Sequence, residues 1–95
     1  MIRVIATFIV EPSKIDEFTQ LATEMVTITR EEKGCAQYDL AQSVDEANRM
    51  VIIEGWQTQE DLDAHSAAEH FTRLVPQIGA LCVEAPSIDA NLQIV

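Results

Sequence analysis

The most restrictive feature of the chain is its first segment, Ile2 to Val10, which is almost entirely apolar or β-branched. A strand with one face in solvent alternates apolar and polar side chains, whereas a strand covered on both faces does not. Pro12 and Ser13 end the run, and Ser13 with Asp16 three residues later predicts a capped helix start. The segment therefore predicts a central strand followed by a helix.

Two helices are predicted from apolar periodicity. Apolar side chains recur at three- and four-residue steps from Lys14 to about Glu32, and Gly34 follows where a left-handed C-terminal cap is needed. Thr58 and Asp61 repeat the capping arrangement, and a second helix is predicted from there to about Ala68, with a further helical turn beyond it.

Strand patterns complete the order of elements. Alternation predicts strands at residues 35–42, 50–57 and 88–94. The order strand–helix–strand–strand–helix–strand is that of the ferredoxin-like α+β fold, βαββαβ, whose four-stranded antiparallel sheet carries both helices on one face. One such domain would occupy residues 1–95. Its other sheet face is left bare, and face-to-face homodimerisation would bury it.

The charge of the chain restricts its partners. Sixteen acidic and six basic residues give a net charge of −10, which disfavours nucleic acid and anionic membrane surfaces. No apolar run reaches the roughly 20 residues of a membrane span. With no secretory signal, and with Cys35 and Cys82 far apart, we expect a cytoplasmic protein with reduced thiols, no disulfide framework and no zinc site.

The scarcest residue types gather in one short segment, which indicates a site. Trp56, the only tryptophan, and both histidines, His65 and His70, lie close together in the sequence, directly after Glu54. Strand alternation puts Glu54 and Trp56 on one face. A buried Glu54 needs a hydrogen-bond donor, which is either one of the histidines or an arginine, Arg49 or Arg73.

His65 and His70 are predicted as catalytic bases, with Glu54 orienting one of them. Five positions on a continuous helix separate two side chains by about 140°, so a shared metal ion is not predicted. If the helix breaks near Ala67 and Ala68, both rings can still converge on the sheet. The alternative is that the histidines cap helix ends or satisfy buried polar groups.

Five further side chains are predicted to line a substrate pocket. Trp56 would stack on an aromatic substrate or, alternatively, fill the core beneath the second helix. Tyr38 would donate to a substrate oxygen or, alternatively, lie at the sheet margin. Phe71, Met50 and Ile52 are expected as walls of the pocket or of the core.

Four short motifs resemble those of a known family. Residues 33–40, KGCAQYDL, then Glu54-Gly55-Trp56, then residues 62–65, LDAH, and residues 69–71, EHF, are similar in order and spacing to the antibiotic biosynthesis monooxygenase domain, especially its small quinol-monooxygenase-like members. The resemblance implies a dimeric α+β barrel. It also implies a pocket in which electron-rich phenols or quinols react with O₂ and no added cofactor.

The leading functional hypothesis is a cofactor-independent monooxygenase acting on a quinol or polyphenol. A histidine would remove a phenolic proton, and the anion would react with O₂. An isomerase of a small phosphorylated carbonyl compound is an alternative, although the cationic side chains are scattered. Haem degradation is disfavoured because relatives with that activity use an asparagine in the first strand, and residues 2–10 contain none. A non-catalytic ligand-binding dimer module is the remaining alternative.

Overall fold

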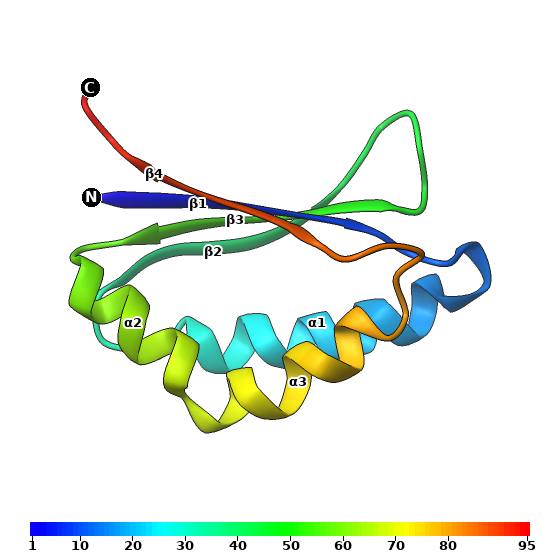
Figure 1. The fold of residues 1–95 in the computed structure, drawn as a ribbon, viewed down its shortest axis with the longest axis horizontal. Helices are drawn as coiled ribbons and strands as arrows, with labels where there is room; N and C mark the ends of the chain where they lie inside the picture. The colour runs from blue at the N-terminus through cyan, green and yellow to red at the C-terminus, as the bar shows by residue number, and fades with distance from the viewer.

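The computed structural model describes residues 1–95 and shows a four-stranded sheet with all helices on one face (Figure 1). In chain order the elements are β1 (Ile2–Ile9), a 3-10 turn η1 (Pro12–Lys14), α1 (Ile15–Thr29), β2 (Cys35–Gln42), β3 (Arg49–Trp56), α2 (Gln59–Ala67), α3 (Glu69–Gly79) and β4 (Ser87–Leu92). The strands pair in the order β2-β3-β1-β4, and every pairing is antiparallel. The predicted ferredoxin-like α+β fold is confirmed, with the second helical segment divided into α2 and α3.

The two faces of β1 differ in burial. Val4, Ala6 and Phe8 point towards the helices and are buried, whereas Ile5 and Ile9 on the opposite face are half-buried. A strand in the middle of a sheet keeps apolar side chains on both faces only when both are to be covered. The helices therefore account for one face of the apolar run and leave the other partly open.

The core lies between the sheet and the helices. α1 and α3 pack against each other beneath the strands. None of the helices is both long and apolar enough to cross a membrane. The buried apolar residues are Val4, Ala6, Phe8, Val10, Phe18, Ala22, Met25, Val26, Tyr38, Met50, Ile52, Trp56, Leu74 and Ile78.

The two predicted helix starts have different outcomes. Thr58 caps α2 as predicted, because its hydroxyl accepts a hydrogen bond from the Asp61 backbone N–H at 3.1 Å. The prediction for Ser13 is wrong: the Glu11 carboxylate accepts hydrogen bonds from both the Ser13 backbone N–H and its hydroxyl. Glu11 thus caps η1, and α1 begins after Lys14 without a side-chain cap.

Gly34 has the predicted left-handed conformation, but it lies in the turn between α1 and β2, because α1 ends at Thr29 and Arg30 is its C-cap. The φ of Gly34 is +79°, a left-handed conformation that side chains with a Cβ rarely adopt. A Cβ there would also collide with the Asp61 side chain. The Gly34 carbonyl accepts from the Gln57 N–H at 2.9 Å, so the turn is fastened to the end of β3.

β4 is an exposed edge strand. Its register places Ile88 opposite Ala6 and Leu92 opposite Ile2, on the face that carries the helices. Even so, Ile88 is 61% and Leu92 69% exposed. The apolar alternation predicted for the last strand is therefore present but uncovered within one chain.

Candidate functional site

β3 presents Glu54 and Trp56 to the helices, side by side on one face of the sheet. Trp56 is fully buried, and its indole Nε1 donates a hydrogen bond to Glu54 Oε1 at 2.9 Å. The prediction that a histidine or an arginine donates a hydrogen bond to Glu54 is therefore wrong. Its donor is neither a histidine nor an arginine, and Arg73 instead pairs with Glu24 and Glu69 on the surface. The tryptophan supplies the donor because residues two apart on a strand share a face.

Tyr38 lies directly opposite Glu54 across the β2–β3 pairing. An irregularity between Cys35 and Gln37 offsets the register at the start of β2. Burial raises the pKa of Glu54 above its usual value, the hydrogen bond from Trp56 opposes this, and the charge of Glu32 adds to it. Burial also raises the pKa of the Tyr38 phenol well above its usual range, so this hydroxyl stays protonated.

The two histidines converge because the helix breaks between them. α2 ends at Ala67, Ala68 has an extended backbone (φ −68°, ψ 151°), and α3 begins at Glu69. The ring centroids of His65 and His70 are consequently 5.9 Å apart, and both rings are buried. A shared metal ion was not predicted because a continuous helix would hold the two rings apart. The structure has no such continuous helix, so that argument does not apply.

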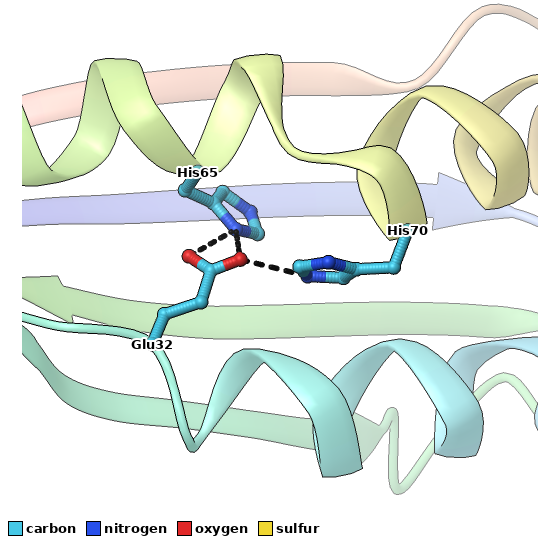
Figure 2. Close-up of side chains that lie close together, drawn as sticks. All are labelled: Glu32, His65 and His70. Atoms are coloured by element: carbon cyan, nitrogen blue, oxygen red, sulfur yellow. Dashed lines mark hydrogen bonds and ion pairs between the residues drawn. The ribbon is translucent and has the colours of Figure 1, made fainter.

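Both histidines contact Glu32, which follows the end of α1 (Figure 2). His65 Nδ1 lies 3.2 and 3.1 Å from the two carboxylate oxygens of Glu32, and His70 Nε2 lies 2.8 Å from Oε1. His70 Nε2 is also 3.1 Å from the hydroxyl of Thr29, the last residue of α1. Glu32, His65 and His70 are named the Glu32 cluster below.

Burial also sets the charge states within the Glu32 cluster. Burial, followed by the charge of His70, lowers the pKa of His65 to about 4. His65 is therefore neutral at pH 7, and its Nδ1–H donates to Glu32 because an ionised carboxylate only accepts. Burial raises the pKa of Glu32, and the charge of His70 lowers it by a smaller amount.

Sequence reasoning did not identify Glu32 as a site residue. One signal was available, because Glu31 and Glu32 directly follow the C-terminus of α1, where the helix dipole favours cations over anions. A carboxylate at this position needs another source of stabilisation. The histidines provide it, but their convergence depends on the break at Ala68.

Aromatic side chains enclose His65. Its ring centroid lies 4.7 Å from that of Trp56, 5.1 Å from that of Phe71 and 5.4 Å from that of Tyr38. Tyr38 and Phe71 approach His65 edge-on, which is a favourable aromatic geometry. The structure therefore gathers Tyr38, Trp56, His65 and Phe71 in one place, next to His70.

A small cavity lies between the sheet and α3. Its volume is about 60 Å³, and Glu54 and Tyr38 are its only ionisable lining residues. Trp56, His65 and His70 do not line it, and Met50 lies beside a separate surface depression near α1. The lining residues are Ala6, Phe8, Met25, Tyr38, Ile52, Glu54, Phe71, Val75, Ile78, Pro86 and Ile88.

A larger hollow opens on the surface beside the Glu32 cluster. Its volume is about 640 Å³, and it shares no lining residue with the cavity. Glu32 and His70 reach it from the cluster, and its other charged residues are Glu31, Lys33, Glu60 and Asp61. The ligand atoms of the Glu32 cluster lie within 4.8 Å of one another, so these three residues are the group of side chains best placed to hold a metal ion.

Comparison with known sequences finds a family and two relatives that are all described as monooxygenases. A sequence profile described as "Antibiotic biosynthesis monooxygenase" matches residues 1–77. The Bacillus subtilis (strain 168) protein named "Putative monooxygenase YcnE" is 36% identical over 77 residues, covering 81% of this chain and 80% of that protein. "Putative monooxygenase Rv0793" of Mycobacterium tuberculosis is 34% identical over 80 residues, covering 84% of this chain and 78% of that protein.

Solved structures match the whole fold. A crystal structure described as an antibiotic biosynthesis monooxygenase superposes with a TM-score of 0.94 at 37% identity, covering 100% of both chains. The structure of Rv0793 superposes with a TM-score of 0.94 at 29% identity, covering 99% of this chain and 95% of the other. These matches extend over the sheet and all the helices that surround the cavity.

Proposed function

The chain belongs to the antibiotic biosynthesis monooxygenase family, and from that premise we propose that it oxidises a quinol or polyphenol with O₂ in the cavity between the sheet and α3. Family membership supports a monooxygenase-like activity in general terms. The observation that carries the specific proposal is the lining of the cavity, which is apolar and aromatic except for the carboxyl group of Glu54 and the phenol of Tyr38. Such a site suits one aromatic ring with a hydroxyl group.

Glu54 is the group that we assign to proton removal. It lines the cavity, and Trp56 fixes its orientation through Oε1. A carboxylate with a raised pKa is a stronger base than an ordinary one and is better matched to a phenol. Proton removal by His65 or His70 stays a prediction from the sequence, since neither histidine lines the cavity.

The reaction needs no external reductant because a quinol holds enough electrons. Deprotonation makes the ring electron-rich, and a C–O bond forms between a ring carbon and O₂. The O–O bond and the C–H bond at that carbon then break, one oxygen atom remains on the ring, and the other leaves as water with the ring proton and the phenolic proton. A hydroquinone and O₂ thus give a hydroxyquinone and water, and the four electrons that reduce O₂ come from the substrate. The roles of the protein are deprotonation, orientation and exclusion of water.

Substrate entry requires the cavity to open. A cavity of about 150 Å³ is known to hold benzene, which is more than twice the volume present here. Pro86 and Ile88 form the wall at the edge strand of the sheet, where Ile88 is 61% exposed. We expect this wall to move outward when a ring binds.

A homodimer completes the proposal. The sheet face opposite the helices carries the half-buried side chains of Ile5, Ile9, Val51 and Ile53. Packing this face against that of a second copy would bury it in both chains. We propose a cytoplasmic homodimer with a small aromatic substrate and O₂ as its partners.

Oxygen uptake with hydroquinones tests the function. Protein treated with a chelator should consume O₂ well above the rate of autoxidation, and Glu54→Gln should lose most of this activity. A variant with both His65→Gln and His70→Gln tests the histidines. Unchanged activity in that double variant would remove them from the chemistry, and uptake no faster than in buffer would reject the proposal.

A non-catalytic ligand-binding dimer is the second candidate. It is favoured by the burial of Trp56, His65 and His70, each of which has an internal hydrogen-bond partner. A hydroquinone that binds saturably but is never oxidised would support this candidate. An isomerase of phosphorylated compounds has less support, because no cationic side chain lines the cavity.

A further inference from the structure

We propose that the Glu32 cluster binds a divalent first-row transition-metal ion. One carboxylate and two imidazoles, supplied by the turn after α1, by α2 and by α3, face one another (Figure 2). Two histidines and one carboxylate are the donor set with which non-haem iron proteins hold a metal on one face of an octahedron. The proposal goes beyond the oxidation described above, because none of these residues lines the cavity.

Two of the three distances between donor atoms suit a metal ion, and all three ligand atoms lie within 4.8 Å of one another. Nitrogen and oxygen ligands lie about 2.0–2.2 Å from such ions, so neighbouring ligands of an octahedron are about 3.0 Å apart. His70 Nε2 and Glu32 Oε1 are 2.8 Å apart, and His65 Nδ1 and Glu32 Oε2 are 3.1 Å apart. The same distances describe hydrogen bonds, in which protons occupy the place of the metal. A metal ion would displace these protons without a large movement of the backbone.

The surface hollow supplies access and a favourable field. Glu32 and His70 form part of its lining, so an ion can reach them from solvent. Glu31, Glu60 and Asp61 line the same hollow against a single cation, Lys33, and the chain as a whole has a net charge of −10. Clustered negative charge attracts cations. Three protein ligands also leave coordination positions for water or an exogenous ligand.

The surroundings of the cluster hold its side chains in place. His65 is enclosed by the rings of Trp56, Phe71 and Tyr38, which restrict its orientation. His70 Nε2 has the Thr29 hydroxyl as a second neighbour at 3.1 Å, and a metal ion at that nitrogen would release this hydroxyl. Imidazole ligands favour zinc, iron, cobalt, nickel and copper, whereas magnesium and calcium favour oxygen ligands.

Titration of the full chain with cobalt(II) tests the proposal. After chelator treatment, calorimetry and visible absorption should show one Co²⁺ per chain with a Kd on the order of micromolar or tighter, and Mg²⁺ should not compete. Glu32→Gln and His70→Gln should each weaken binding by roughly 100-fold. Glu60→Gln is the matched control, because it removes a carboxylate from the hollow without removing a ligand, and its affinity should change less than about threefold.

Two results would overturn the metal site. One is the absence of saturable Co²⁺ binding in the wild-type chain. The other is binding that persists in both Glu32→Gln and His70→Gln, with circular dichroism confirming that both are folded. If one of these variants does not fold, the other decides. No substrate is involved, so the outcome is independent of whether the cavity oxidises quinols.

Discussion

The cavity and the Glu32 cluster are neighbours, because Tyr38 and Phe71 line the cavity and also contact His65, yet the two regions differ in nearly every physical property. The cavity is small and apolar, with one carboxyl group, Glu54, that is held by a tryptophan. The cluster joins a carboxylate to two imidazoles beside an acidic hollow. The difference teaches that two neighbouring regions of a small domain can suit ligands of different chemistry. The apolar cavity suits an aromatic ring, and the cluster beside the acidic hollow suits a cation.

The packing of the aromatic side chains around His65 can be disrupted by Trp56→Ala. Removing a fully buried tryptophan costs about 3–5 kcal/mol of unfolding free energy. The change should impair both regions, since Trp56 contacts His65 and orients Glu54. Urea denaturation measures the loss. Trp56→Phe is the control: it keeps most of the ring but leaves Glu54 without its donor, at a cost of about 1–3 kcal/mol. Equal losses in the two variants would contradict the packing role.

Glu54→Gln separates the two regions by function. The amide oxygen can still accept from Trp56 Nε1, so the fold should be kept, but the base is lost. We expect kcat for quinol oxidation to fall by roughly 100-fold or more, while Co²⁺ affinity at the Glu32 cluster is unchanged. Oxygen-electrode kinetics and calorimetry measure the two effects. Full activity in this variant would show that another group removes the proton.

Gly34→Ala should disturb the cluster and leave the cavity intact. The left-handed backbone at Gly34 makes a Cβ unfavourable by about 1–2 kcal/mol, and the Cβ would displace Asp61. Because this turn carries Glu32, Co²⁺ affinity should fall while oxygen uptake is retained. Gly79→Ala is the matched control, because a Cβ there meets nothing within 4 Å. Equal stability of the two variants would contradict the role of the turn.

The difference in the pH dependence of stability between wild type and Glu54→Gln should report on Glu54, because the other titrating groups are common to both. The folded pKa of Glu54 is raised above 4.5, so between that value and the folded pKa the native state binds more protons than the unfolded state. Wild type should therefore gain stability relative to Glu54→Gln as pH falls through this window, by about 1.4 kcal/mol for each unit of the shift. Activity should fall over the same window, because the base becomes protonated. Parallel stability profiles would show that Glu54 is not perturbed.

Local patterns were sufficient to predict the fold. Alternation and helical periodicity describe single elements, and the order of those elements determines the sheet. The helix start at Thr58 was predicted correctly because its donor is three residues away. The start at Ser13 was not, because the carboxylate of Glu11 competes for the same groups.

The candidate site depends on contacts that are distant in the sequence. Alternation placed Glu54 beside Trp56, and the hydrogen bond between them follows from that face. Glu32 contacts both histidines only because the helix breaks at Ala68. The sequence indicated that both rings could converge if the helix broke there, but it did not predict the break. The partial burial of Glu32 follows from the tertiary packing of α1 against α3, which local periodicity does not predict.

Mass spectrometry of the product formed under ¹⁸O₂ tests the central claim most directly. With metal-stripped protein and a hydroquinone, we expect a hydroxyquinone that carries one ¹⁸O atom per molecule, the second atom having left as water. Wild-type protein should give this product and Glu54→Gln should not. A product without label, or labelling that requires an added metal ion, would contradict cofactor-independent oxygenation in the cavity.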